Sequence, residues 1–583
     1  MKNPNQPRRK FLRDSFLLAS GIFLAPNFIS CKKDPLVYGA LETDGFHIAQ
    51  FDHGVASFDP TSSQIIIWTR YSTTRPSDLI KWQLAFDAQF NNIVRQGEVS
   101  TDASRDYTVA IEVQDLPAGK KFYYRFLHSG DMNMSETGET ITIATDPSQL
   151  KLAVCSCAHY AAGLFNVYSA MAASDADIII HLGDYIYEYG NGEYGTNDQT
   201  ITLGRTLAPA HELLTLEDYR TRYRQYRTDK KLQLAHRLKP FICIWDDHEV
   251  ANDAYTDGAQ NHNPGEGSYQ VRKQAALQAY NEYLPFMSND SLKIYRNFSY
   301  GSLLNLNMLD TRIIGRQKQL KYGDFMYTPA GSTTEELNTP AFLTAWQDAS
   351  RTILGATQRD WVVSRVNAST ARWQVLAQQV IMAKMVIPEG MMKILIPILT
   401  AVDKGEIKSI PAKDLAAARE KLPKMAAVAA RRQSNPATES AADVLLPYNL
   451  DAWDGYPAER DYLFNAFNKK VVVLSGDSHN AWYNLLKDKN GTEKGKELAA
   501  SSVTSPGFES YLKFIFESCP ALLGTFETLV KDLIPDVSYL NASQRGFVKV
   551  TFTQASVNSE WIFVNAVFSD AYSTVTGKTV NLT

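Results

Sequence analysis

The feature of this sequence that most constrains its fold is a series of apolar, strand-length segments separated by helical patterns. Six of these segments are residues 151–156, 177–182, 241–245, 303–309, 372–376 and 471–475. Strands that alternate with helices predict an α/β region. In open α/β sheets, ligands bind beyond the carboxyl ends of the strands, so the residues that follow these segments are candidates for one shared site.

Polar side chains follow all six predicted strands. They are Cys157; Asp184 with Tyr187; Asp246, Asp247, His248 and Glu249; Asp310, Thr311 and Arg312; Gln378 and Gln379; and Asp477 with His479. One or two such strand ends would arise by chance, whereas six predict one constellation. Taken alone, Cys157 would more often be a buried core thiol, but its order with Asp184 and Tyr187 favours metal ligation.

The residue types in this constellation indicate two unlike metal sites. A thiolate from Cys157 and a phenolate from Tyr187 favour a trivalent ion such as Fe³⁺, because a phenol ionises readily only beside a strong positive charge. The carboxylates of Asp184, Asp247 and Asp477 suit a neighbouring Ca²⁺, Mg²⁺ or Mn²⁺. Such a metal pair polarises phosphoryl oxygens and generates a hydroxide nucleophile near neutral pH.

The composition excludes several other classes of protein. With 44% hydrophobic and 21% charged residues, the chain of 583 residues is an ordinary globular one, long enough for two domains. The formal charge of −4 provides no basic field for polyanions, and no nucleic-acid-binding patch is evident. Five cysteines exclude a disulfide-stapled scaffold, and ten histidines limit any His-rich metal site.

The first thirty residues are interpreted as an export signal of the twin-arginine type. Arg8 and Arg9 precede an apolar stretch at residues 16–25, which is too short for a membrane span of about 20 residues. Residues 28–31 resemble a lipobox, which predicts lipidation of Cys31, with a simply cleaved signal or a spare thiol as alternatives. We therefore expect the twin-arginine export machinery as a partner, a periplasmic or cell-envelope location and possible membrane attachment through Cys31.

A short tether at residues 31–45 leads into a region with a different pattern at residues 46–147. Its strand-length segments are rich in β-branched and aromatic residues and are separated by Gly, Pro, Asp and Asn. This pattern predicts a β-sandwich of the Ig or fibronectin-III type. No catalytic cluster occurs there, so the chemistry is expected in the second domain, residues 148–583.

Two helical segments of the second domain carry no candidate catalytic residue. Residues 216–227 predict a helix that packs its tyrosines and exposes its arginines to solvent. Residues 387–446 form a predicted helical insertion, in which residues 391–402 are either an amphipathic lid or, as we favour, part of a packed helix pair. Substrate selectivity is expected to reside in this insertion.

Six blocks occur in a fixed order: Ser-Cys-Ala-His-Tyr at 156–160, His-Leu-Gly-Asp-Tyr-Ile-Tyr-Glu at 181–188, Trp-Asp-Asp-His-Glu-Val at 245–250, Leu-Asp-Thr-Arg at 309–312, Ser-Arg-Thr-Ile-Leu-Gly at 350–355 and Ser-Gly-Asp-Ser-His at 475–479. Together they resemble the alkaline phosphatase D (PhoD-like) family of the calcineurin-like metallophosphatase superfamily. The resemblance implies an α+β multidomain fold, with an N-terminal Ig/fibronectin-III-like sandwich followed by a four-layer α/β/β/α metallophosphatase domain.

The resemblance also implies a set of metal ligands and catalytic residues. An Fe³⁺ site would take Cys157, Asp184, Tyr187 and His479, and an adjacent Ca²⁺ site would take Asp184, Asp247 and Asp477. Zn²⁺, Mn²⁺ or Mg²⁺ are alternatives to these ions. The catalytic residues would be Asp247 and His248, and His248 would contact the transferring phosphate.

Four further residues are expected near the site with supporting roles. Asn252 is a candidate helper of the second metal, and Arg312 is either a phosphate contact or a buried salt bridge. Asp246 and Glu249 are expected to orient their neighbours rather than act as bases.

The function that follows is an exported, metal-dependent alkaline phosphatase/phosphodiesterase that hydrolyses phosphate esters through a metal-activated hydroxide and releases phosphate. Two alternatives remain open at the level of sequence. One is a surface binding lipoprotein with a non-catalytic metallophosphatase core. The other is a phospholipase D-like or nuclease-like phosphodiesterase.

Overall fold

The computed structural model describes residues 50–288, 290–333, 335–403, 420–421, 444–511 and 525–583. The predicted export signal, Cys31 and the tether lie outside the described residues, as does most of the insertion predicted at residues 387–446. No helix within the described ranges is long and apolar enough to cross a membrane.

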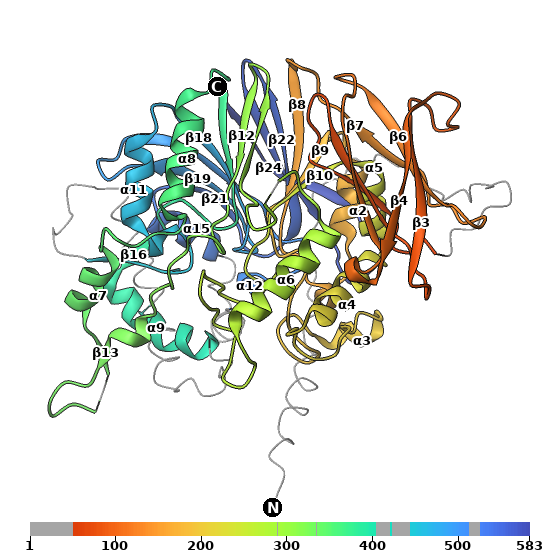
Figure 1. Cartoon of the computed structure of the whole chain (residues 1–583). Coiled ribbons are helices and arrows are strands. Elements are labelled where there is room, and N and C mark those ends of the chain that lie inside the picture. Colours follow the sequence, from red (N-terminus) through yellow and green to blue (C-terminus); the bar gives the residue numbers. More distant parts are fainter. Residues whose placement is uncertain (1–49, 289, 334, 404–419, 422–443, 512–524) are drawn as a thin grey trace, which may run out of the picture.

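Two large sheets form the centre of the molecule (Figure 1). The nine-stranded sheet has the order β24 (Thr574–Leu582), β23 (Val557–Val564), β22 (Arg545–Thr553), β8 (Gln149–Cys155), β9 (Ile178–His181), β10 (Phe241–Cys243), β1 (Val55–Phe58), β2 (Ile65–Arg70) and β5 (Thr108–Val113). The seven-stranded sheet has the order β11 (Arg296–Tyr300), β12 (Leu304–Met308), β15 (Trp373–Ala377), β18 (Val471–Ser475), β20 (Glu493–Ala499), β19 (Ala481–Lys487) and β21 (Val537–Asn541).

The six predicted strands are all present, but they divide between the two sheets. β8, β9 and β10 are parallel neighbours in the first sheet, and β12, β15 and β18 are parallel neighbours in the second. Their side chains are almost all buried on both faces, as the continuous apolar runs predict. Six strand ends therefore converge from two sheets.

The two sheets pack against each other and share one hydrophobic core. This core joins Val154 and Ile180 of the first sheet to Leu306 and Leu474 of the second. Trp561 of β23 also donates its indole N–H to the Ala499 carbonyl of β20 at 2.9 Å. Burial of these apolar faces is the main force that brings the two sets of strand ends together.

Helices cover the outer faces of both sheets (Figure 1). On the side of the nine-stranded sheet lie α2 (Asn166–Ala173), α4 (Leu216–Arg227), α5 (Lys230–Leu238) and α6 (Tyr269–Tyr283). On the side of the seven-stranded sheet lie α8 (Gly355–Ala368) and α11 (Pro457–Ala466), whose buried residues belong to a second core. The described chain thus has a mixed α/β fold.

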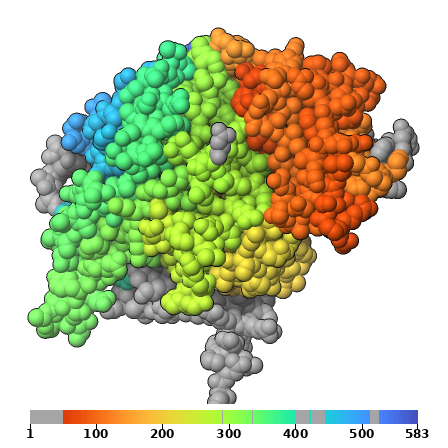
Figure 2. Space-filling view, viewed as in Figure 1, coloured from red at the N-terminus to blue at the C-terminus, as the bar shows by residue number. Residues whose placement is uncertain are grey.

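The N-terminal strands are not an isolated module. β3 (Ser77–Ala85), β4 (Ile93–Asp102), β6 (Lys121–His128) and β7 (Gly138–Ile141) form a separate four-stranded sheet, which belongs to the red-to-orange N-terminal lobe in Figure 2. β1, β2 and β5 face it across a small core of their own, yet they extend the nine-stranded sheet, because β1 pairs with β10 at Phe58 and Phe241. A buried ion pair between Asp59 and Arg296 (2.7 Å) reinforces the junction.

The prediction that α4 exposes its arginines to solvent is wrong. Its tyrosines are buried as expected, but Arg220, Arg222 and Arg227 are buried as well. Arg220 pairs with Glu282 at 2.6 Å and donates to the Ser104 carbonyl at 2.7 Å. The N-terminal region therefore covers a helix face that the local sequence marks as exposed.

The start of the predicted insertion is described and is helical. α9 (Glu389–Asp403) contains Pro397 and buries Met391, Met392 and Ile396 in the second core. It packs beside a short ribbon of β16 (Val386–Pro388) and β17 (Leu445–Pro447). The described part of α9 is thus packed against the protein rather than free as a lid, and the second helix of the predicted pair lies almost entirely outside the described residues.

Candidate metal centre and active site

The candidate site lies where loops leave the carboxyl ends of β8, β9, β10, β12 and β18. Four of its residues have positive φ angles although none is a glycine: Cys157 (61°), Asp184 (54°), Asp477 (61°) and His479 (60°). Such left-handed backbone conformations are costly for residues with a Cβ and cluster at functional sites. Here they turn each loop sharply just beyond its strand.

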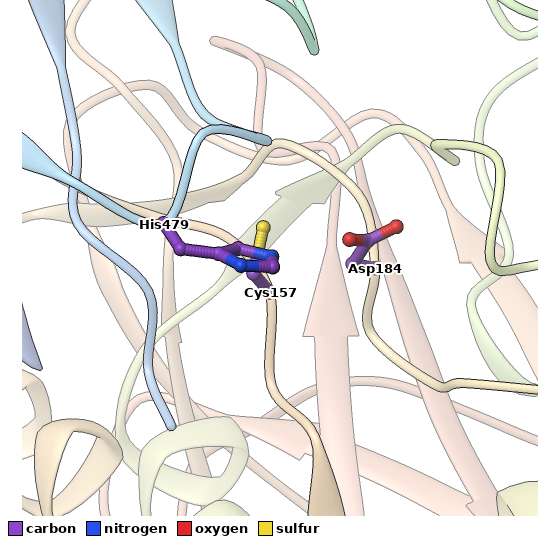
Figure 3. A group of neighbouring side chains, drawn as sticks. All are labelled: Cys157, Asp184 and His479. Atoms are coloured by element: carbon purple, nitrogen blue, oxygen red, sulfur yellow. The ribbon is translucent and has the colours of Figure 1, made fainter. Parts of the chain in front are cut away.

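Three buried side chains from three loops form the first cluster (Figure 3). One ligand atom each from Cys157, Asp184 and His479 lies within 4.8 Å of the others. The Tyr187 hydroxyl joins this cluster, because it donates to the Asp184 carboxylate at 2.9 Å and lies 3.3 Å from Nε2 of His479. The ligand set that the resemblance implied for Fe³⁺ is therefore brought together.

The hydrogen bonding of His479 prepares it for metal binding. Its Nδ1 lies 2.8 Å from the Pro506 carbonyl oxygen, which can only accept a hydrogen bond. Nδ1 therefore carries the proton, and the Nε2 lone pair faces the cluster. Metal-binding histidines are commonly oriented in this way by a backbone carbonyl.

A second cluster adjoins the first and consists mainly of carboxylates. One ligand atom each from Asp184, Asp247 and His248 lies within 4.8 Å of the other two, and the same holds for Asp246, Asp247 and Asp477. Asp184 belongs to both clusters, so its carboxylate would be available to an ion in either of them. Asp247 therefore lies close both to Asp184 and to Asp477, the other two residues expected at the second metal.

Two carboxylate oxygens show why this donor set fits metal ions. Among the described residues, neither Oδ1 of Asp184 nor Oδ1 of Asp247 has a hydrogen-bond partner, although both are buried. Buried anionic oxygens without a partner are strongly unfavourable. A cation between the carboxylates would satisfy both of them, and sulfur, nitrogen and phenol donors stand on the other side of Asp184.

The electrostatics without metal oppose ionisation of most ligands. Burial raises the pKa of the Cys157 thiol, the Asp184 carboxyl and the Tyr187 phenol well above their ordinary values. For Asp247 burial acts in the same direction, but the charge of Arg312 overcomes it and lowers the pKa to about 2. Metal binding would favour the deprotonated form of each ligand.

Asp477 leads to a prediction for the protein stripped of metals: its thermal stability should fall as the pH rises from about 4 to about 7. Burial raises the pKa of Asp477 in the folded protein from 3.8 to about 7. Between pH 4 and pH 7 the unfolded chain has therefore lost this proton while the folded protein keeps it, so a rise in pH stabilises the unfolded state relative to the folded state. Scanning calorimetry in chelator at constant ionic strength measures the effect. Asp477→Asn should flatten the decline, whereas the exposed Asp257→Asn should not; an unchanged slope in Asp477→Asn would contradict the assignment.

Arg312 lies beneath the carboxylate cluster with its side chain 0% exposed. Its Nε donates to Asp246, one terminal nitrogen donates to Asp451 at 2.6 Å, and the other donates to Asp477 at 3.0 Å and lies 3.4 Å from Asp247. With every guanidinium nitrogen committed to a carboxylate, this arrangement favours the buried salt bridge over the alternative of a phosphate contact.

Glu249 and Glu188 hold neighbouring groups in position. Glu249 accepts hydrogen bonds from the backbone amides of Asp184 (2.9 Å), Tyr185 (2.5 Å) and Asp246 (2.6 Å), so it ties two site loops together. Glu188 lies 2.7 Å from Nδ1 of His248, a distance that fixes the direction of the ring. Both glutamates are completely buried, and their contacts are orienting ones.

Some predicted site residues point elsewhere. The Asn252 side chain donates to Gln260 at 2.9 Å, and its backbone amide donates to Glu188 at 2.7 Å. Gln379 accepts from Thr311 and donates to the Trp245 carbonyl at 2.6 Å. The expectation that all six strand ends enter one constellation is therefore wrong for β15, because its two glutamines satisfy buried groups next to the site.

Sequence reasoning missed several contacts because they come from irregular segments. The Ser505 hydroxyl donates to the Tyr187 hydroxyl at 2.7 Å, and the Pro506 carbonyl orients His479. Asp451 bridges Arg312 and Arg316. None of these residues follows a predicted strand, and no spacing signal marks them.

A large cavity of about 1330 Å³ opens beside His248. Asn252, Asp253 and Pro506 also line it, so it begins at the edge of the two clusters. Its far wall is formed by the loop between β23 and β24, including Phe568. His248 is thus the one residue of the two clusters that lines this cavity.

Comparisons with known proteins define the class. The family model for PhoD-like phosphatases matches residues 152–561, and that for the N-terminal domain of these phosphatases matches residues 39–144. Every candidate metal ligand lies in the larger match. The chain is a phosphoric ester hydrolase and belongs to the PhoD-like phosphatase family, as the sequence blocks predicted.

Individual relatives extend the comparison over the whole fold. Alkaline phosphatase D of Bacillus subtilis (strain 168) is 30% identical over 584 residues, which cover 95% of this chain and 83% of that protein. A solved structure of PhoD has a TM-score of 0.70 at 28% sequence identity and covers 92% of this chain and 91% of its own. The mixed α/β, multidomain architecture of this chain is thus that of PhoD.

Proposed function

We propose that the protein is an exported, metal-dependent alkaline phosphatase/phosphodiesterase that releases phosphate from phosphate esters. The observation that carries this proposal is the buried donor set, with orphaned oxygens on Asp184 and Asp247, in a member of the PhoD-like phosphatase family. Burial of these two oxygens without a hydrogen-bond partner is unfavourable. A bound metal pair removes that cost and gives the cluster a function.

We assign Cys157, Asp184, Tyr187 and His479 to an Fe³⁺ site and Asp184, Asp247 and Asp477 to a Ca²⁺ site, with Zn²⁺, Mn²⁺ or Mg²⁺ as alternatives. Sulfur and phenolate donors suit the first ion, and carboxylate oxygens suit the second. When bound, the metal pair supplies Lewis-acid stabilisation of phosphoryl oxygens and a hydroxide nucleophile.

His248 is assigned the contact with the reacting phosphate. The bond between its Nδ1 and Glu188 leaves Nε2 as the nitrogen that can face a ligand. The Glu188 carboxylate also raises the pKa of His248 well above its ordinary value, against the effect of burial. A protonated Nε2 can donate a hydrogen bond or a proton to a phosphate or leaving-group oxygen.

The domain organisation and location belong to the same proposal. We assign residues 46–147 to an Ig/fibronectin-III-like sandwich, supported by the four-stranded sheet and the core that it shares with β1, β2 and β5. Residues 148–583 are assigned to the four-layer α/β/β/α domain, supported by two packed sheets with helices outside them. The basic and apolar residues before Cys31 support twin-arginine export and lipid attachment in the cell envelope.

The proposal predicts a coloured, metal-containing enzyme. The purified full chain should contain iron and a second metal, hydrolyse p-nitrophenyl phosphate and bis-p-nitrophenyl phosphate at alkaline pH, and show a visible band from the Tyr187 phenolate. Tyr187→Phe should remove the band, because it deletes the donor oxygen. Elemental analysis, absorption spectra and steady-state rates measure these properties.

Tyr168→Phe is the matched control, since its hydroxyl binds His181 in the core at 2.8 Å. This variant should keep the band. A colourless, iron-free but fully active enzyme would refute the Fe³⁺ assignment, and activity that survives complete removal of metals would refute metal dependence.

A further inference from the structure

The cavity beside His248 is much larger than the reacting group requires. Its volume is about 1330 Å³, whereas a water molecule in the liquid occupies about 30 Å³ and ligand pockets typically measure about 300–1,000 Å³. A phosphoryl group at the His248 end fills a small part of this space. The remainder is available for the organic group of the ester.

The charges on the cavity wall argue against a second anion. Among the described lining residues, Arg545 is the only side chain with a fixed positive charge. The other charged residues there, apart from His248, are Asp198, Asp253 and Glu509. The wall away from His248 therefore offers little attraction to an additional negative group.

Arg545 itself is neutralised within the wall. One terminal nitrogen forms an ion pair with Glu509, the other donates to the Ser543 carbonyl at 2.9 Å, and Nε donates to the Thr504 carbonyl at 3.3 Å. Its side chain is 11% exposed. Because the charge of Arg545 is already paired with Glu509, an anion that approached Arg545 would have to compete with that carboxylate.

The rest of the wall combines uncharged polar groups with one apolar face. Amide side chains of Asn197, Gln260, Asn261 and Gln544 line it, and Phe568 adds a half-exposed ring (48%) from the β23–β24 loop. Amides hydrogen-bond hydroxyl or amide groups without requiring charge. An aromatic ring packs against the apolar face of a sugar, polyol or aryl group.

We propose that this cavity binds the organic part of the substrate and selects uncharged, hydroxyl- or amide-bearing alcohols, with Glu509 as a specificity-determining residue. By neutralising Arg545, Glu509 removes the cation that would attract a second carboxylate or phosphate. Esters of neutral alcohols are therefore preferred over nucleoside polyphosphates and other polyanionic substrates. This inference rests on the proposed function and specifies the substrate class of the same site.

The test uses two aryl phosphates of nearly equal shape, 4-carbamoylphenyl phosphate and 4-carboxyphenyl phosphate. Wild-type protein should have at least about tenfold higher kcat/KM for the carboxamide, the size of effect expected from one unfavourable partly buried charge. Glu509→Gln frees Arg545 and should reduce this preference at least about fivefold. Comparing the ratio between variants cancels the intrinsic difference between the two leaving groups.

Three further variants make the result specific. Glu509→Gln combined with Arg545→Gln should restore the preference, because the freed cation is gone. Gln544→Lys adds a cation to the wall without disturbing the ion pair and should also reduce the preference. The control Glu493→Gln, whose carboxylate pairs with Lys470 and Lys496 outside the cavity wall, should retain the wild-type ratio.

Equal use of both esters by the wild type, or a preference that neither Glu509→Gln nor Gln544→Lys changes, would overturn the inference. Turnover of neither ester would instead count against the proposed function. In that case the ratio of the two dissociation constants, measured by titration calorimetry on the same variants, tests the selectivity of the cavity.

Discussion

Replacing Asp184 with asparagine is expected to lower phosphoester turnover by about 10²–10³-fold, the scale seen when one essential electrostatic group is removed from an active site. Asp184 is the one carboxylate shared by both clusters. One of its oxygens accepts from Tyr187, and the other has no partner among the described residues. An amide would remove the negative charge between the two ions, so both should bind more weakly.

Steady-state rates on p-nitrophenyl phosphate, together with elemental analysis, measure this effect. The matched control is Asp175→Asn, because Asp175 precedes β9 and thus lies near the opposite end of that strand, where it pairs with Lys151. This variant should keep near wild-type rates and metal content. Full activity and metal content in Asp184→Asn would exclude the bridging role.

Replacing Arg312 with methionine is expected to reduce the free energy of unfolding by about 3–5 kcal/mol, as when one partner of a buried ion pair is deleted. Arg312 contacts Asp246, Asp247, Asp451 and Asp477 from a completely buried position. Without it, the carboxylates would repel one another in a region of low dielectric. Denaturant titration of the metal-stripped protein at pH about 7 measures the loss.

Arg372→Met provides the control, since Arg372 is exposed and stacks on Trp373. Its effect should be within about 0.5 kcal/mol of zero. Adding Asp246→Asn to Arg312→Met should recover part of the lost stability, because one uncompensated charge is removed. An Arg312→Met protein as stable as the wild type would show that the guanidinium does not hold the cluster together.

The local sequence is sufficient to predict the strands and most of the residues that meet in the two clusters. Strands such as β9 and β18 are short apolar runs buried on both faces, and a polar residue after such a run marks the end of the strand. Cys157, Asp184 and His479 could therefore be placed near one another before any contact was known. The family resemblance then separated the two ligand sets.

What the sequence could not predict depends on partners distant in the chain. Strands buried on both faces have the same composition in one sheet or in two. The residues alone therefore do not show how the strands divide, and only the family resemblance implied two sheets. Arg220 has the sequence pattern of a solvated residue, yet Glu282 and the Ser104 carbonyl cover it. Ser505 and Asp451 lie in irregular segments, where neither period nor spacing indicates the direction of a side chain.

The pairing of β1 with β10 gives the N-terminal region a part in the architecture of the site. β10 leads directly into Asp246, Asp247, His248 and Glu249 and is flanked by β9 on one side and β1 on the other. Without β1, β10 would become an open edge strand, with unpaired backbone groups beside the chemistry. The cooperative folding unit that holds the loop after β10 in place therefore includes β1, which begins at Val55. We expect the N-terminal region and the domain that carries the site to unfold in a single transition rather than as separate modules.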